Sequence, residues 1–416
     1  MENTPKKKIA LVIIRYGAEV NGGAEVHCRM LAERLLPYYR VEVLTTTMRV
    51  FDDPAQDYPE GVQVENGVEV RRFRPAPVDG ERFRALRRRS KTVRRIRYYL
   101  SKAGLLRPLA DRHPRWGWGC TAERRYFEAQ KGHTPAMLHF IAEHRDDYAA
   151  LIFMNYFFSQ TVLGSLIAPE KTILIPLAHP DRSLYYSLQT EVFTRVRHIA
   201  FNAPAEERLC RGLFGRAMAP GSVLGAGLDP APESDWAEVR AKYGLPERYV
   251  LYLGRITPGK VRTLIPDFLR YAERSGTDAK LVLAGGIDPA FRKTDSPRVL
   301  FTGFVSDAEK SALIRHATVM VNPSPHESLS LLMLEALAAG VPALVNGRAE
   351  VMKDHCEKSG AAWWYRGKRD FRRKLHRLLT DDGLRRELGA KGPAYVRAHY
   401  DWEGIIRKLR GIIDRL

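Results

Sequence analysis

The sequence has few of the features that mark zinc-bound, disulfide-bonded or membrane-spanning proteins. Its four cysteines are widely separated and form no C-x-x-C pair, which argues against a structural zinc site and against a disulfide framework. No apolar run approaches the ~20 residues that span a bilayer. The basic N-terminus leads into a short apolar stretch, Ile9 to Ile14, which we interpret as a buried strand and not as an export signal. These absences favour a protein of the reducing cytoplasm.

The glycine-rich loop near the N-terminus, VNGGAE over residues 20–25, lacks the G-x-G-x-x-G spacing of dinucleotide-binding proteins. No acidic residue ends the strand-like segment that follows it, so a nicotinamide cofactor is not expected. Gly22 and Gly23 nevertheless precede a helical pattern, and such a loop can lie close to a phosphate or to a sugar.

The length of the chain predicts the number of its domains, and its charge predicts a contact surface. A chain of 416 residues exceeds the roughly 250 to 300 residues that one core supports, so two domains are expected. The formal net charge is +19, and the stretch from Arg71 to Arg125, with 18 Lys or Arg and four acids, accounts for +14 of it. A local excess of this kind usually indicates an electrostatic contact surface.

Strand-like and helical patterns alternate in the first half of the chain. The continuous apolar run at residues 8–14, a helical pattern from Ala24 and a strand at Val41–Thr46 predict a βαβ unit. Basic helices and loops at about residues 80–135 interrupt the alternation and indicate an insertion. Further strands are predicted at Val68–Phe73, Ala150–Met154, Thr172–Leu177 and Ile199–Phe201.

A second alternation begins after PAPESDW, a linker-like stretch at residues 230–236. Strands are predicted at Tyr249–Leu253, Lys280–Ala284, Val299–Phe301, Val319–Asn322 and Ala343–Val345, and helices at Thr263–Ser275, Asp307–His316 and Ser330–Ala339. The predicted fold class is α/β, with two Rossmann-like doubly wound domains in tandem. Such a pair implies a cleft, because ligands of these sheets bind beyond the carboxyl ends of the strands.

The most informative segment, residues 321–345, carries two acids around a helix start that we predict near Ser328 to Ser330. Free amides of Ser328, Leu329, Ser330 and Leu331 suit a diphosphate. Glu335, inside the helix, suits a ribose diol, and Glu327 can turn into the cleft from the loop. The plainer interpretation makes Glu327 an N-terminal charge and Glu335 a solvated side chain. Glu335, however, stands among apolar residues, so its carboxylate needs a partner.

Two weaker patterns accompany these acids. In LYLGRITPGK, residues 251–260, a strand enters a glycine loop that is followed by Arg255 and Lys260, and these cations could stabilise a departing nucleoside diphosphate. They could equally be solvated loop charges. His179 directly follows a strand and could bind a sugar hydroxyl, although a purely structural histidine is as common.

Together these residues resemble the family-4 retaining glycosyltransferases of the GT-B fold, the glycosyl transferases group 1. The family's E-x7-E signature matches Glu327 and Glu335, and its GR-x4-K segment matches Gly254, Arg255 and Lys260. The GGAE loop matches residues 22–25, the interdomain histidine matches His179, and LVLAGG and FTGFVSD, at 281–286 and 301–307, resemble the segments that approach the nucleobase. The chain departs from the family pattern at residues 328–330, which read Ser-Leu-Ser where Gly-Phe-Gly is commoner.

The resemblance implies roles for these residues. Glu327 and His179 are expected at the reacting sugar, and Glu335 at the donor ribose. Donor contacts are also expected from Gly22, Gly23, Arg255, Lys260, Gly285, Phe304, Val305, Ser328, Leu329, Ser330 and Leu331. The resemblance implies an acceptor-side domain at 1–230, a donor domain at 231–398 and a final helix, 399–416, that returns to the first domain. No bound metal or other cofactor is expected, and no D-x-D triplet is present.

The expected reaction is transfer, with retention, of a hexose-type sugar from a UDP- or GDP-sugar to a lipid-linked or cell-surface glycan. The basic insertion then favours a peripheral position on the cytoplasmic face of an anionic membrane, because Lys and Arg alternate with apolar side chains there. A solvated basic face or a soluble anionic acceptor are the alternatives. A nucleotide-sugar epimerase or a phosphorylase would share the fold. A nucleic-acid-binding protein is disfavoured because no recognition module accompanies the charge.

Overall fold

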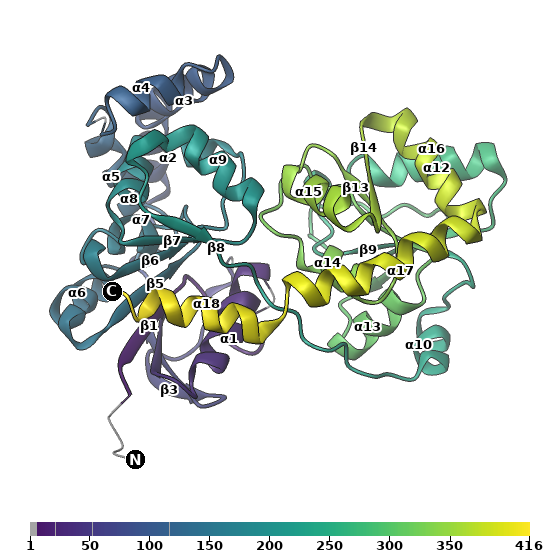
Figure 1. The fold of residues 1–416 in the computed structure, drawn as a ribbon, viewed down its shortest axis with the longest axis horizontal. Helices are drawn as coiled ribbons and strands as arrows, with labels where there is room; N and C mark the ends of the chain where they lie inside the picture. The colour runs from purple at the N-terminus through teal and green to yellow at the C-terminus, as the bar shows by residue number, and fades with distance from the viewer. Residues whose placement is uncertain (1–5, 21, 52, 116) are drawn as a thin grey trace. The chain divides into compact units, whose positions relative to one another are not determined.

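The computed structural model describes residues 6–20, 22–51, 53–115 and 117–416, and it divides into two compact units. The N-terminal unit comprises Met1–Ala226 and Glu403–Leu416, and the C-terminal unit comprises Gly227–Trp402. The ribbon in Figure 1 carries the labels of the helices and strands used below.

An eight-stranded sheet forms the middle of the N-terminal unit, in the order β3-β4-β2-β1-β5-β6-β7-β8. All neighbours pair in parallel except β3 and β4, which are antiparallel. The strands are β1 Lys8–Val12, β2 Arg40–Thr46, β3 Gly61–Glu65, β4 Val68–Phe73, β5 Ala150–Met154, β6 Thr172–Ile175, β7 His198–Phe201 and β8 Gly221–Val223. The central strand β1 is apolar because both of its faces are covered: Ile9 to Val12 have no exposed surface.

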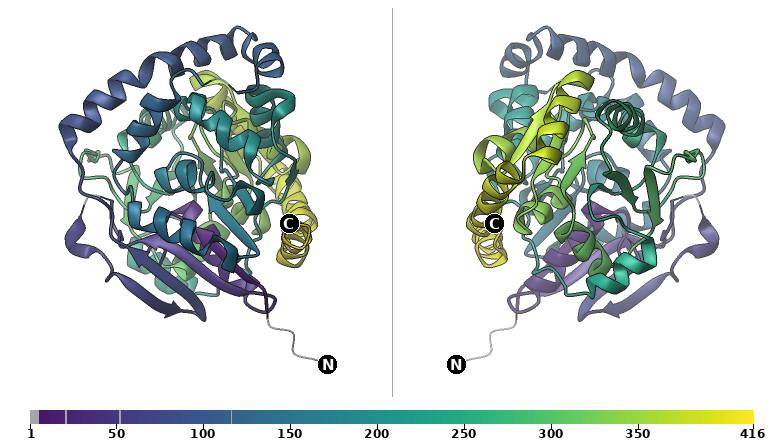
Figure 2. Two further views of the ribbon diagram at one scale, coloured as in Figure 1. Left: turned by 90° about the vertical axis from the view of Figure 1, so that its left-hand side faces the viewer. Right: turned by 90° about the vertical axis from the view of Figure 1, so that its right-hand side faces the viewer.

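Helices surround this sheet. They are α1 Gly23–Leu35, α2 Gly80–Arg89, α3 Lys91–Lys102, α4 Leu106–Arg112, α5 Cys120–Glu128, α6 Pro135–His144, α7 Ser159–Gly164, α8 Ser187–Arg195 and α9 Pro204–Phe214. Short 3-10 turns lie at Pro54–Gln56, Arg145–Asp147, Pro169–Lys171, Arg182–Tyr185 and Gly215–Ala217. The helices α2 to α5 form the basic insertion, and Figure 2 shows α2 and α3 as an arm along the outside of the unit.

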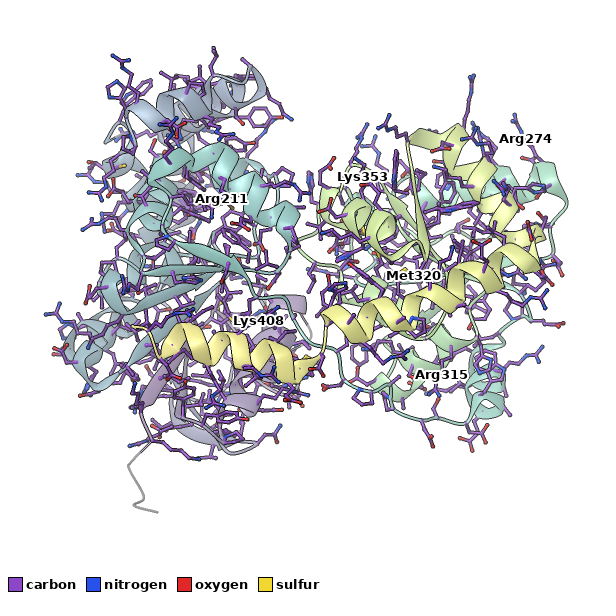
Figure 3. All side chains as sticks on the ribbon, viewed as in Figure 1. Arg211, Arg274, Arg315, Met320, Lys353 and Lys408 are labelled. Carbon is purple, nitrogen blue, oxygen red and sulfur yellow. The ribbon has the colours of Figure 1, made fainter. Side chains whose placement is uncertain are left out.

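The last helix, α18 Trp402–Ile413, contributes its residues from 403 onward to the N-terminal unit. Its apolar face is buried at Ile405, Leu409 and Ile412. The Tyr39 hydroxyl donates to Asp414 Oδ1 at 3.1 Å, which ties the end of the chain to the residues between α1 and β2. Lys408 lies on the exposed face of this helix (Figure 3).

A six-stranded, wholly parallel sheet forms the C-terminal unit, in the order β11-β10-β9-β12-β13-β14. Its strands are β9 Tyr249–Leu253, β10 Lys280–Ala284, β11 Val299–Gly303, β12 Val319–Asn322, β13 Ala343–Asn346 and β14 Ala362–Tyr365. Its helices are α10 Trp236–Tyr243, α11 Pro258–Val261, α12 Leu264–Ser275, α13 Asp307–Arg315, α14 Leu331–Ala338, α15 Glu350–Ser359, α16 Gly367–Thr380 and α17 Asp382–His399. Met320 of β12 is buried in this sheet, whereas Arg274 and Arg315, at the ends of α12 and α13, are exposed (Figure 3).

The predicted fold class is confirmed, and the strands predicted at 150–154, 249–253, 280–284 and 319–322 coincide with β5, β9, β10 and β12. Three strands escaped the sequence analysis for different reasons. The residues of β3 are largely exposed in an edge strand, β8 has only three residues, and β14, AWWY, has no polar residue to mark an alternation. The helix predicted to start near Ser328 to Ser330 begins later, at Leu331.

Candidate active site

Glycine loops meet at the carboxyl ends of β9, β10 and β11. The Gly254 amide donates to the Ala284 carbonyl at 3.0 Å, and the Gly285 amide donates to the Gly303 carbonyl at 2.8 Å. A Cβ added to Gly285 would lie 2.3 Å from the Gly254 carbonyl oxygen, and Gly285 has a φ of +137°. Only glycine fits such a backbone contact. The ends of β9, β10 and β11 therefore form one surface on which the main chain is not covered by side chains of these glycines.

Arg255 and Lys260 follow this surface on the loop after β9. The Arg255 guanidinium pairs with Asp288 Oδ2 at 3.2 Å, and its side chain is 66% exposed. An exposed pair of this kind contributes only about 0–1 kcal/mol, so Asp288 leaves Arg255 able to bind a stronger anion. Lys260 is exposed within α11, whose first turn is capped by the Thr257 hydroxyl. The sequence analysis did not identify Asp288.

The segment that carries Glu327 is held by Asn322, the last residue of β12. The Asn322 amide nitrogen donates to Ser330 Oγ at 3.1 Å and lies 3.5 Å from Glu327 Oε1. Its carbonyl oxygen accepts from the Ser324 amide at 3.0 Å. One buried side chain thus links the beginning and the end of the loop. A polar residue closing an otherwise apolar strand was the signal for it in the sequence.

Ser330, at the start of α14, has a left-handed backbone with φ +68° and ψ +65°. A non-glycine residue in this region is strained by about 1–3 kcal/mol. The departure from Gly-Phe-Gly at residues 328–330 therefore falls on a backbone that favours glycine. The amides of Leu331 and Leu332, in the first turn of α14, have no carbonyl within the helix to bind, so they are open to an anion.

His355 of α15 holds the same loop through a hydrogen bond, and the sequence analysis did not identify this residue. Its Nε2 lies 3.0 Å from the Leu329 carbonyl oxygen and its Nδ1 lies 2.9 Å from the Tyr395 hydroxyl. A carbonyl oxygen only accepts, so Nε2 carries the proton and Nδ1 accepts from Tyr395. Burial lowers the pKa of His355 to about 4, which keeps the imidazole neutral.

Glu335 has the partner that its apolar surroundings require. The Lys310 ammonium of α13 donates to Glu335 Oε1 at 3.1 Å, and both side chains are 26% exposed. Burial raises the pKa of the Glu335 carboxyl although the Lys310 charge acts in the opposite direction. Glu335 Oε2 has no hydrogen-bond partner among the described residues. A hydroxyl donor would complete the coordination of this carboxylate.

Side chains and backbone from β9, β11, β12 and α14 converge at one edge of this sheet. A Cβ on Gly254 would lie 3.9 Å from a methyl carbon of Leu332 and 3.5 Å from the Tyr252 hydroxyl. Burial raises the pKa of Tyr252, and the nearby Glu327 charge adds to the effect. Phe304, which directly follows β11, is 66% exposed and offers an aromatic surface beside Val305.

In the N-terminal unit, Gly22 is the N-cap of α1 and Gly23 is its first residue. Glu25 folds back toward this turn, where its Oε1 accepts from Arg15 Nη2 at 2.6 Å. A Cβ on Gly22 would collide with Glu25, whereas a Cβ on Gly23 would have nothing within 4 Å. Gly23 is therefore the open position of the loop. Asn21 lies outside the described residues.

His179 lies in the loop after β6 and is half-buried. Its Nε2 is 3.5 Å from Asp181 Oδ2, and its ring packs edge-on against Tyr156 with the centroids 6.0 Å apart. Leu177, two residues earlier, has a φ of +54°. The loop thus holds a strained backbone at the carboxyl edge of the sheet, where such strain often accompanies function.

Glu206 of α9 holds this loop in place. Its carboxylate accepts from the Ala178 amide and, at 2.6 Å, from the Asn202 amide. Burial raises the pKa of Glu206 to about 8. Glu206 therefore joins the loops that follow β6 and β7. The sequence analysis did not find it because its partners are main-chain amides.

Comparison of folds identifies the class of protein. The chain superimposes on sucrose-phosphate synthase from Thermosynechococcus elongatus with a TM-score of 0.68 and 17% identity, over 99% of each chain. Two α/β units with mainly parallel sheets, each with its glycine loops at the carboxyl edge, have the GT-B fold.

Sequence comparison then shows which family the chain resembles. Residues 247–381 match the family model described as "Glycosyl transferases group 1". The chain is 24% identical to an uncharacterized glycosyltransferase of Methanocaldococcus jannaschii over 96% of each protein. It is 34% identical, over 31% of this chain and 35% of the relative, to a GDP-mannose-dependent alpha-(1-6)-phosphatidylinositol dimannoside mannosyltransferase of Mycobacterium tuberculosis. Residues 247–381 thus resemble the group 1 glycosyltransferases, the chain as a whole has the GT-B fold, and the relatives indicate a hexosyltransferase.

Proposed function

We propose that the enzyme transfers a hexose, with retention, from a UDP- or GDP-sugar to a glycan acceptor, and that the C-terminal unit holds the donor. The convergence of Arg255, Glu327 and the first turn of α14 at one sheet edge carries this proposal. The similarity to a mannosyltransferase named for GDP-mannose falls on 135 residues and supports a nucleotide-sugar donor.

Each group has a physical task in this proposal. The diphosphate binds to the open amides of α14 together with Arg255 and Lys260, because anions are stabilised at helix N-termini and by fixed cations. A ribose hydroxyl donates to Glu335, which Lys310 holds in place. The bare backbone at Gly285 and the exposed Phe304 face the base. Glu327 lies against the transferred sugar, oriented by Asn322.

Departure of the nucleoside diphosphate adds negative charge to the leaving group. In this proposal Arg255, Lys260 and the helix dipole face that charge, so they stabilise the transition state more than the ground state. We propose that these cations make a bound metal unnecessary. Hydrolysis of the donor in excess EDTA should then match hydrolysis in added Mg²⁺, and a strict Mg²⁺ requirement would disprove this part of the proposal.

We further propose that His179 and the open Gly23 contact the transferred sugar from the N-terminal unit. Both follow strands at the carboxyl edge of their sheet, which is the edge where such folds bind ligands. His179→Ala should lower kcat with little change in the KM for the donor, whereas Gly23→Val should weaken the donor complex by filling the open position.

The direct test is a hydrolysis screen of UDP-, GDP- and ADP-hexoses, followed by NMR of the released sugar to read the anomer. Glu335→Ala should mainly raise the KM for the donor, and Glu327→Ala should mainly lower kcat. Equal and small effects of both substitutions, or first release of the inverted anomer, would contradict the assignment.

We propose a lipid-linked or cell-surface glycan as the acceptor, with the basic insertion resting on an anionic membrane. Among the described residues, no helix is long and apolar enough to cross a bilayer. The insertion instead exposes apolar side chains amid its arginines: Ile96 (37%), Tyr99 (56%), Leu105 (53%) and Trp118 (55%). Apolar groups that enter the interface and cations that attract anionic headgroups together give peripheral binding.

Vesicle pelleting tests this contact. Vesicles with anionic lipid should bind the enzyme at low salt and release it as salt rises. Arg95→Glu replaces a positive by a negative charge, which should cost about 2 kcal/mol and weaken binding about 30-fold, since each basic residue contributes about 1 kcal/mol at such a surface. Arg274→Glu, an equal charge reversal at an exposed position of the C-terminal unit, is the control. Equal losses in both variants would show that net charge, and not the insertion, is responsible.

A further inference from the structure

A cavity of about 530 Å³ opens in the N-terminal unit where β2 and β4 end. Its volume falls within the ~300–1,000 Å³ of small-molecule sites. Residues from the segments 47–51 and 54–58, which follow β2, and residues 74–78, which follow β4, supply most of its wall. It therefore lies at the carboxyl edge of the sheet, the edge at which doubly wound folds bind their ligands.

The wall of the cavity is mainly apolar, with Met48, Val50, Phe51 and Pro75 among its residues. The Phe51 ring is fixed, because it stacks on Phe158 with the centroids 5.9 Å apart and lies 4.1 Å from the Arg15 guanidinium carbon. A rigid apolar wall matches the C–H face of a sugar ring.

Asp57 and Tyr58 contribute polar groups to this lining, and Arg74 and Lys131 contribute cations. Asp57 accepts from the Thr47 hydroxyl through Oδ2 at a long 3.4 Å, and its Oδ1 has no hydrogen-bond partner among the described residues. An ionised carboxylate only accepts, so its ligand must donate. A sugar hydroxyl can donate such a bond. Arg74 belongs to the rim, since its side chain is 78% exposed.

The cavity also adjoins the loop that follows β1. A Cβ on Gly17 would lie 2.5 Å from the Tyr58 hydroxyl, so the loops after β1 and β2 are in contact. Arg15, which pairs with Glu25 of the GGAE loop, also donates to the Arg49 carbonyl at 3.1 Å. The cavity is thus linked through direct contacts to the loop that contains Gly23.

We propose that this cavity binds a saccharide residue of the acceptor, with a ring hydroxyl donating to Asp57. The inference rests on the proposed transfer to a glycan, and it adds the chemistry by which the acceptor is recognised. A neutral sugar with a free hydroxyl next to its apolar face is the expected occupant.

Saturation-transfer NMR on the full chain, with methyl α-D-mannopyranoside, methyl α-D-glucopyranoside and inorganic phosphate as probes, tests the proposal without any donor. At least one glycoside should bind at millimolar concentration. Val50→Trp, which fills the cavity, should weaken that binding at least tenfold, and Asp57→Asn about fivefold. Val64→Trp is the matched control, because Val64 is 71% exposed on β3 and lies outside the cavity.

The outcomes separate the two proposals. Equal glycoside binding by wild type and by the Val50 and Asp57 variants would overturn the assignment, and so would binding of phosphate alone. Saccharide binding that is lost in both variants, in an enzyme that hydrolyses no nucleotide sugar, would support the cavity while refuting the proposed donor chemistry. Circular dichroism spectra and thermal unfolding midpoints that match those of the wild type establish that both variants are folded.

Discussion

Protonation of His355 should weaken the C-terminal unit and loosen the loop that carries Glu327. The folded environment holds the imidazole neutral, with its Nε2 proton donated to the Leu329 carbonyl and its Nδ1 accepting from Tyr395. A second proton would place a charge in a buried site and remove the acceptor for Tyr395. Since Leu329 directly precedes the strained Ser330, loss of this support should also reach the donor site.

The magnitude follows from the lowered pKa. Burial lowers the pKa of His355 from 6.5 to about 4, so the unfolded chain binds more protons than the folded one between these values. The contribution of His355 to stability must then fall as the pH drops from about 6.5 to about 4. At 1.36 kcal/mol for each pH unit, the full loss is about 3 kcal/mol.

Denaturant unfolding of wild type and His355→Gln at pH 7, 6, 5 and 4.5 measures this loss. Glutamine remains neutral, so the stability difference between the two proteins should shrink steadily as the pH falls. His139→Gln, at an exposed position of the N-terminal unit, should leave the wild-type dependence unchanged. A stability difference that stays constant from pH 7 to pH 4.5 would refute the reasoning. In a donor-hydrolysis assay at pH 7, His355→Gln should raise the KM for the donor.

Other substitutions test the proposed donor site at the carboxyl edge of the C-terminal sheet. Lys310→Met should raise the KM for the donor severalfold at unchanged kcat, because Glu335 loses its only charged partner among the described residues; an unchanged KM would remove Lys310 from the site. Ser330→Ala should cost about 1 kcal/mol in unfolding experiments through the lost Asn322 bond, whereas Ser330→Gly should be nearly neutral because relieved backbone strain offsets that loss. Gly285→Ala should cost at least about 2 kcal/mol, since its methyl group would meet backbone, and a smaller loss would show that the strand ends can separate.

The sequence could predict those parts of the molecule that local pattern determines. Continuous apolar runs marked the buried strands, and Glu327, Arg255 and Gly254 could be grouped because each lies near the carboxyl end of a strand in one parallel sheet. Their convergence follows from topology, since all carboxyl ends of a parallel sheet lie on one edge.

The supporting residues could not be predicted in the same way. Lys310 reaches Glu335 from a different helix, 25 positions away, and His355 binds a carbonyl 26 positions away. Such contacts depend on how helices pack and leave no periodic trace in the sequence. The left-handed backbone of Ser330 could not be predicted from the serine itself; the only signal was the glycine that the family pattern has at this position.

The N-terminal unit is built from two segments that lie far apart in the sequence, and this has a consequence for the synthesis of the protein. Because α18 buries Ile405, Leu409 and Ile412 in that unit, a chain that stops anywhere before residue 403 leaves the surface that covers these side chains exposed to water. The ribosome synthesises the whole C-terminal unit before this closing segment emerges, so the part that begins first is completed last. Premature termination should therefore yield aggregation-prone fragments, and a peptide of residues 403–416 supplied separately should rescue a fragment ending at 226.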